Sequence, residues 1–256
     1  MELLRQIGTL LGQIDALWGG ISALAAASLF IWRLVRKPRK HFPSNNEEFY
    51  RYYSAQIANA VREIWITSDG FNMVNPESRK YAEMMKSGFE KALSNGVIAH
   101  RFQILDTMHL NWIDELILLK EAHAENLKIF CNKTLHGIPN VCVMDPFHKK
   151  CVAERMEHST GLLGQGSKPE TYTFQHKDGQ YAEKTLQIVK NAIEHPATRE
   201  LDVEGLKELK RELLTERLNA LKAWKSSPRN SGDIRESGVF DEYVIGQFIA
   251  NENEEG

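Results

Sequence analysis

Histidine, aspartate and lysine residues gather in the middle of the chain, where their side chains could serve a hydrolytic or a ligand-binding site. His136 precedes Asp145, and His148 and Lys149 follow it closely. An imidazole can transfer protons near neutral pH or attack phosphorus, and an ammonium group can hold phosphate oxygens. The candidate catalytic residues are His136, Asp145 and His148, and the candidate ligand-binding residues are Asp69, Asp145 and Lys149.

Three of these candidates also have a structural interpretation, to which we give more weight. His136 stands in a Leu-His-Gly loop, and His148 opens a basic turn. Asp69 precedes Gly70 in a turn, although the end of a strand in an open α/β sheet is a common place for ligand contacts. The sequence has no glycine-rich nucleotide loop, no nucleophile elbow and no zinc pattern, so no cofactor or metal is predicted.

Alternating helices and strands must position these candidates. Phe49, Tyr53, Ile57 and Val61 recur every four residues, which is typical of an amphipathic helix. The same reasoning predicts helices over 47–61, 78–95, 110–124 and 180–195, strands over 63–68, 97–105, 127–131, 141–144 and 151–156, and a hairpin over 160–175. This order indicates an α/β fold with a mixed β-sheet flanked by helices.

The layout resembles the phospholipase D-like domain family. The run Ala60-Val61-Arg62-Glu63-Ile64-Trp65 resembles the opening of these domains, and 92–101 is similar to their second helix and strand. The stretch 141–156, with Asp145 between two strands, falls where the family places its catalytic signature, and 174–195 resembles the closing strand and helix. The resemblance covers about 150 residues and implies the family's α/β fold.

The family signature, H-x-K-x4-D followed by G-S-x-x-N, is not preserved. In the family the histidine attacks phosphorus, and the lysine and asparagine hold phosphate oxygens. Aligning the signature aspartate with Asp145 places Ile138 at the histidine position and Asn140 at the lysine position. Because these side chains supply neither a nucleophile nor a cation, the resemblance implies a fold without this chemistry. Family members can also pair to build one site, so we expect a homodimer or homo-oligomer.

An uncharged segment over 16–32 predicts an N-terminal membrane anchor. As a helix it would cover about 25 Å, close to the roughly 30 Å hydrocarbon core of a bilayer. Trp18 and Trp32 stand near its ends, where indole rings settle at lipid headgroups. The basic residues that follow it include Arg33, Arg36 and Lys37.

The basic flank places the N-terminus outside and the rest of the chain in the cytoplasm, as a single-pass membrane protein. A cleaved signal peptide is the competing interpretation, but its positive charge would precede the apolar run. A buried core helix is a further alternative. Cys131, Cys142 and Cys151 lie in apolar segments with a strand-like pattern and are interpreted as reduced core thiols. Reduced thiols are typical of cytoplasmic proteins.

The sequence therefore divides into four regions. Residues 1–40 form the anchor with its basic flank, 44–196 the phospholipase D-like domain, 200–225 an amphipathic helix, and 226–256 a linker with a short apolar segment. That segment, Val239–Ala250, is expected to dock on its own domain or on a protein partner. The formal net charge of −2 gives no general attraction to nucleic acid.

Three functional hypotheses remain open. The first is a membrane-anchored, non-catalytic phospholipase D-like sensor or interaction protein, in bacterial defence or signalling. The second is a membrane-bound phosphodiesterase, a nuclease or phospholipase that works as a homodimer with a divergent site. The third is a membrane-disrupting effector whose anchors cluster through small residues such as Gly19 and Gly20.

Overall fold

A computed structural model of the chain describes residues 39–105, 108–157, 171–226 and 242–255. Its contacts divide the chain into two units, Met1–Arg39 and Lys40–Gly256. The predicted anchor, including Trp18, Trp32 and the basic flank, lies outside the described residues. Within the described ranges, no helix combines the length and the apolar character that crossing a membrane requires.

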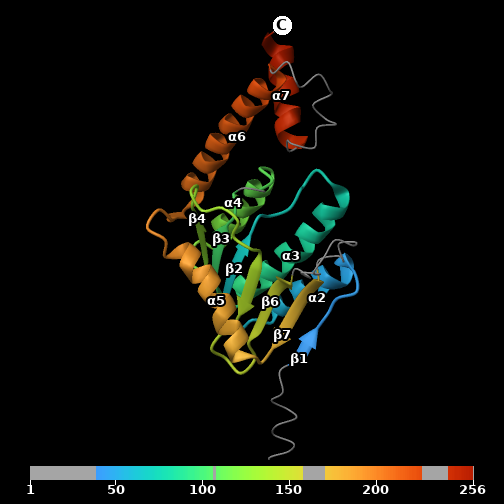
Figure 1. Cartoon of the computed structure of the whole chain (residues 1–256), viewed down its shortest axis with the longest axis vertical. Helices are drawn as coiled ribbons and strands as arrows, with labels where there is room; N and C mark the ends of the chain where they lie inside the picture. Colours follow the sequence, from blue (N-terminus) through green and yellow to red (C-terminus); the bar gives the residue numbers. More distant parts are fainter. Residues whose placement is uncertain (1–38, 106–107, 158–170, 227–241, 256) are drawn as a thin grey trace, which may run out of the picture. The chain divides into compact units, whose positions relative to one another are not determined.

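One mixed β-sheet of 8 strands, in the order β1-β7-β6-β5-β2-β3-β4-β8, forms the centre of the fold (Figure 1). β2 is parallel to β3 and β3 to β4, whereas β2–β5, β5–β6, β6–β7 and β4–β8 are antiparallel pairs. The strands are β1 (Arg39–His41), β2 (Glu63–Ser68), β3 (Ile98–Gln103), β4 (Leu127–Cys131), β5 (Val141–Met144), β6 (Val152–Glu157), β7 (Thr171–His176) and β8 (Arg199–Leu201).

Helices cover both faces of this sheet, as the sequence predicts. On one face α5 (Gly179–Ile193) packs against β5 and β6, and on the other α2 (Asn46–Ala58), α3 (Pro76–Ser94) and α4 (Trp112–Ala122) enclose the main core (Figure 1). α6 (Val203–Lys225) packs on α4, and α7 (Glu242–Glu255) packs on α6.

Short polar side chains determine where four helices begin. Asn45, Asn75, Asp178 and Asp202 each accept a hydrogen bond from a backbone N–H in the first turn of α2, α3, α5 and α6. Such caps satisfy amide groups that have no partner within the helix. The starts of these helices therefore follow from local chemistry.

Side chains alternate across the sheet, so neighbours along one strand belong to different cores. Ile66 of β2 faces the main core, whereas Trp65 packs on the α5 side. The strand register places Ile66 opposite both Arg101 and Cys142, and Cys142 opposite Glu154. Because paired residues share a face of the sheet, Arg101 and Glu154 point into the main core.

Most predicted elements are confirmed, with differences at the edges of the sheet and at the end of the first helix. The helix predicted over 47–61 ends at Ala58, so Val61 is exposed and does not belong to its buried face. The predicted strands over 63–68, 127–131 and 141–144 coincide with β2, β4 and β5. β1 and β8 are 3 residues each and were not predicted, because so short a run carries no periodicity. β8 lies beyond Pro196, where we expected the domain to end, and its pairing with β4 extends the sheet. The three cysteines are buried and free, as expected.

The C-terminal apolar segment lies against the chain's own α6. Ile245 and Phe248 form a small buried cluster with Leu221. Val244 joins the main core. Part of Val239–Ala250 falls outside the described residues, but its described part follows the first of the two expected modes, docking on its own domain.

Asp145 connects the end of β5 to the chain segment that precedes β2. Its carboxylate accepts hydrogen bonds from the backbone N–H groups of Val61 (2.9 Å), Arg62 (2.8 Å) and Glu63 (3.2 Å). The side chain is 3% exposed, and the residue has φ 51°, a left-handed conformation that aspartate and asparagine tolerate better than most. Asp145 thus satisfies three amides at the amino end of β2.

We expect Asp145→Ala to lower the free energy of unfolding by about 3 kcal/mol, because three amides lose a charged acceptor. Asp145→Asn should lose about half as much, because its amide oxygen still accepts and asparagine tolerates a positive φ. Urea denaturation of both variants measures this. An alanine variant within about 0.5 kcal/mol of the wild type would contradict the structural role.

Candidate functional site

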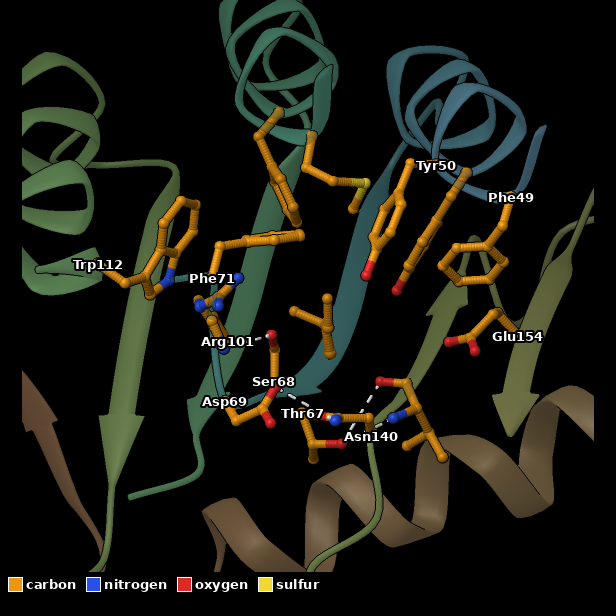
Figure 2. A pocket seen from close by; sticks show the side chains of 16 residues that line it. Phe49, Tyr50, Thr67, Ser68, Asp69, Phe71, Arg101, Trp112, Asn140 and Glu154 are labelled. Atoms are coloured by element: carbon orange, nitrogen blue, oxygen red, sulfur yellow. Dashed lines mark hydrogen bonds between the residues drawn. The ribbon is translucent and has the colours of Figure 1, made fainter. Parts of the chain in front are cut away.

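A pocket opens in the main core at the carboxyl end of β2. α2, α3 and the start of α4 form its walls, and β3, β5 and β6 contribute residues to its floor (Figure 2). The centre of a water-sized sphere can move through about 70 Å³ of it, room for roughly five waters or a small ligand. Its aromatic walls are Phe49, Tyr50, Tyr53, Phe71, Phe89 and Trp112.

Arg101 supplies the positive charge of this pocket. It lies on β3 and is only 4% exposed. Its Nε donates a hydrogen bond to Gln103 Oε1 (3.2 Å), and its Cζ lies 5.5 Å from the centre of the Trp112 ring. Burial lowers the pKa of Arg101 to about 10, against the opposing effects of Tyr53 and Asp69. The guanidinium therefore stays charged at neutral pH, at a cost in solvation.

Three buried polar atoms among the pocket's lining residues make no hydrogen bond within the described part of the chain. They are Arg101 Nη2, Trp112 Nε1 and Asn140 Oδ1. Figure 2 shows the indole nitrogen of Trp112 on the side of its ring that faces Arg101. Because leaving a buried donor or acceptor without a partner costs about 1–3 kcal/mol, three such atoms in one pocket indicate a place prepared for a polar occupant.

Glu154 adds a carboxyl group that is neutral at pH 7. It is 3% exposed on β6, and burial raises its pKa to about 8, although hydrogen bonds from Tyr53 and from the backbone of Cys142 favour the charged form. The same burial raises the pKa values of the Tyr53 hydroxyl and the Cys142 thiol well above their usual ranges. These three groups form a mostly uncharged polar cluster beside Arg101.

Gly70 allows Trp112 to close the pocket. Its φ is +93°, and a Cβ atom at this position would overlap the Trp112 indole ring. Glycine alone combines this conformation with so close an approach. Trp112 also packs edge-on against Phe71, with ring centres 5.1 Å apart, so the turn after β2 and the start of α4 hold each other in place.

The sequence-predicted candidates divide between two edges of the sheet. Asp69 lies in the pocket, where its Oδ1 accepts a hydrogen bond from Asn140 Nδ2 (3.2 Å). Asp145 lies at the opposite end of β2, since its backbone N–H donates to Glu63 O (2.9 Å). β2 has 6 residues, so these edges are roughly 17 Å apart. Asp69 and Asp145 therefore do not belong to one site.

The candidate histidines are also separated. His148 and Lys149 follow Asp145 at the amino edge of β2, where they line a shallow pocket with Phe147. His136 is exposed in the loop between β4 and β5. Ile138 belongs to a small apolar cluster with Phe102 and does not line the Arg101 pocket. Within one copy of the described chain, these residues do not converge on a common substrate position.

Sequence reasoning missed Arg101, Glu154 and Trp112. Arg101 and Glu154 lie inside predicted strands, and only the face of the sheet that each residue occupies distinguishes them from exposed strand residues. The signal was present, because Ala99 and Arg101 alternate with His100 and Phe102, and a charged residue at a core-facing position is exceptional. Trp112 was hidden because helix periodicity explains it as an ordinary core residue.

No family model matches the sequence, and no curated protein is significantly similar to it. Among the solved structures to which the chain is similar at low identity are the following three. Nuc from Salmonella typhimurium, a phospholipase D family member, is 12% identical with a TM-score of 0.46, over 65% of this chain and 99% of that one. TrmBL2, an archaeal chromatin protein, is 13% identical with a TM-score of 0.41, over 73% and 66%.

The third structure is phosphatidylserine synthase from Haemophilus influenzae Rd KW20. It is 12% identical with a TM-score of 0.42, over 73% of this chain and 45% of that one. At these identities and TM-scores, none of the three similarities assigns an activity to this chain.

Glu154 should make stability fall as pH rises. In the unfolded chain this carboxyl ionises with the ordinary glutamate pKa of 4.5, whereas in the fold its pKa is about 8. Between pH 4.5 and about 8 the carboxyl ionises in the unfolded chain but not in the fold. The free energy of unfolding therefore falls as the pH rises through this range, and the full stability is present only below pH 4.5.

Glu154→Gln removes this penalty while keeping an acceptor for Tyr53. We expect the variant to gain on the order of a few kcal/mol relative to wild type at pH 8 and little at pH 5. Thermal unfolding at both pH values measures the difference, with the exposed Glu90→Gln as the matched control. An equal effect of Glu154→Gln at both pH values would show that Glu154 is already ionised in the fold.

Proposed function

We propose that this chain is a membrane-anchored, non-catalytic binding protein on a phospholipase D-like scaffold, whose cytoplasmic domain senses a small ligand. The observation that carries the proposal is the Arg101 pocket. A charged, buried guanidinium with an unsatisfied nitrogen, next to an unsatisfied indole N–H, suits recognition of a ligand oxygen. The aromatic walls would bury the body of that ligand.

Phosphodiester hydrolysis is less well supported by the same geometry. That reaction needs a nucleophile, a proton donor and cations around one phosphate. The residues that line the Arg101 pocket include one cation and no histidine. His148 lies at the other edge of β2 with Asp145. The separation of His148 from the Arg101 pocket favours binding without catalysis.

Membrane attachment is the second part of the proposal. Its support is the uncharged run 16–32, its flanking tryptophans and the basic residues from Arg33 onward. A sensor held at the inner face of a membrane would report a ligand to other membrane-bound proteins, including further copies of itself. Bacterial defence or signalling is the setting that we propose for such a device.

Incubating the full chain with bis(4-nitrophenyl) phosphate, and separately with plasmid DNA, tests the absence of catalysis. We expect no release of nitrophenol and no cleavage beyond the rate of a buffer blank. A matched pair, His136→Ala and His148→Ala, should behave like the wild type. Hydrolysis that either substitution abolishes would establish the phosphodiesterase and overturn the proposed function.

Carbonate extraction of membranes tests the anchor. We expect the full chain to stay in the membrane pellet and a variant with Trp18, Trp32 and the intervening apolar residues removed to appear in the supernatant. Externally added protease should spare the C-terminal domain in intact cells. Release of the full chain by carbonate would contradict the anchor while leaving the pocket untouched.

A further inference from the structure

The unsatisfied atoms of the Arg101 pocket define which chemical groups a ligand must carry. Arg101 Nη2 and Trp112 Nε1 are donors only, so they need an acceptor oxygen. Arg101 is 4% exposed and Trp112 is 2% exposed, so neither donor can turn toward bulk water. The guanidinium carbon lies 5.5 Å from the centre of the indole ring, which puts both donors in one neighbourhood.

The charges around the pocket limit the charge of the ligand. Arg101 is the single cation among the lining residues, and the carboxyl group of Asp69 lines the same pocket and favours the charged form of Arg101. Glu154, with its pKa raised to about 8, adds no charge at neutral pH. A phosphate dianion would meet one cation and one carboxylate, whereas a monoanion with two oxygens matches the two donors without excess charge.

The aromatic walls and the volume of the pocket limit the size and shape of the ligand. Phe49, Tyr50 and Phe89 enclose the space from α2 and α3, and Phe71 encloses it from the turn after β2. The free volume suits a compact molecule rather than a nucleotide or a lipid. Flat rings stack against aromatic walls more favourably than bulky aliphatic groups do. The third unsatisfied atom, Asn140 Oδ1, is an acceptor, so it would receive a hydroxyl or amino hydrogen of the ligand.

We propose that the Arg101 pocket binds a small, flat monocarboxylate, whose carboxylate oxygens accept hydrogen bonds from Arg101 Nη2 and Trp112 Nε1. A hydroxyl or amino substituent on the ring donates to Asn140 Oδ1. This inference rests on the proposed function and names the chemical class of the ligand for that same site. The buried guanidinium favours a charged acceptor, because Arg101 Nη2 gains in the complex the hydrogen bond that it lacks in the free protein.

Isothermal titration calorimetry on the full chain in lipid nanodiscs tests the inference. The probes are benzoate, the three monohydroxybenzoates, benzamide and phenyl phosphate. We expect benzoate to bind at least about tenfold more tightly than benzamide, because one charge-assisted hydrogen bond is worth roughly that factor. Benzoate should also bind more tightly than phenyl phosphate, because the second negative charge of the phosphate has no cation to pair with in this pocket. One hydroxybenzoate isomer should bind more tightly than benzoate.

Two substitutions connect the binding to the pocket. Arg101→Met should remove the preference for benzoate over benzamide, and Trp112→Phe, which keeps the ring but loses the N–H, should weaken benzoate binding about tenfold. The matched control is Lys128→Met, a sheet cation on the α5 face, which should bind like the wild type. If Arg101→Met does not fold, Trp112→Phe still decides the outcome.

Three results would overturn the inference: no benzoate or hydroxybenzoate binding to folded wild-type protein, equal affinity for benzoate and benzamide, or binding that Trp112→Phe leaves unchanged. The first result would mean that water alone satisfies these atoms. None of the three is a hydrolysis result. Nitrophenol release in the phosphodiester assay would instead overturn the proposed function, so the two failures are distinguishable.

Discussion

The burial of one charged arginine constrains the site more than any other interaction. Arg101 lies in the middle of the sheet, on the face covered by α2, α3 and α4, and is almost fully shielded from solvent. A charge there is tolerated only if hydrogen bonds and nearby negative or polarisable groups offset the lost hydration. Gln103, the Trp112 ring and Asp69 do so in part. A ligand would supply the hydrogen-bond acceptor that Arg101 Nη2 still lacks.

The Arg101 pocket and the buried carboxylate of Asp145 lie at opposite ends of β2. Asp145 satisfies backbone amides at the amino end of β2, and Asp69 joins the pocket at the carboxyl end. The length of β2 therefore separates Asp145, which binds backbone amides, from Asp69, which lines the pocket. Glu154 and Tyr53 keep the pocket floor polar, and Tyr53 and Asp69 both favour the charged form of Arg101.

Much of the fold follows from sequence periodicity, whereas most of the site does not. The strand over 63–68 and the helix starting after Asn45 are visible because alternation and capping are local signals. β8 is invisible because 3 residues acquire strand geometry only by pairing with β4. Asp69 could be proposed from its place after a strand. That Arg101 and Glu154 share one pocket could not be predicted without the strand register. The register brings together residues 53 positions apart through two intervening strands.

Side-chain ¹⁵N nuclear magnetic resonance of the full chain, titrated with benzoate, tests the central claim most directly. The account predicts that the Arg101 guanidinium and the Trp112 indole N–H resonances shift together and saturate at one ligand per chain, while the other arginine and indole signals stay in place. Benzoate that leaves both resonances unmoved at saturating concentration would contradict it.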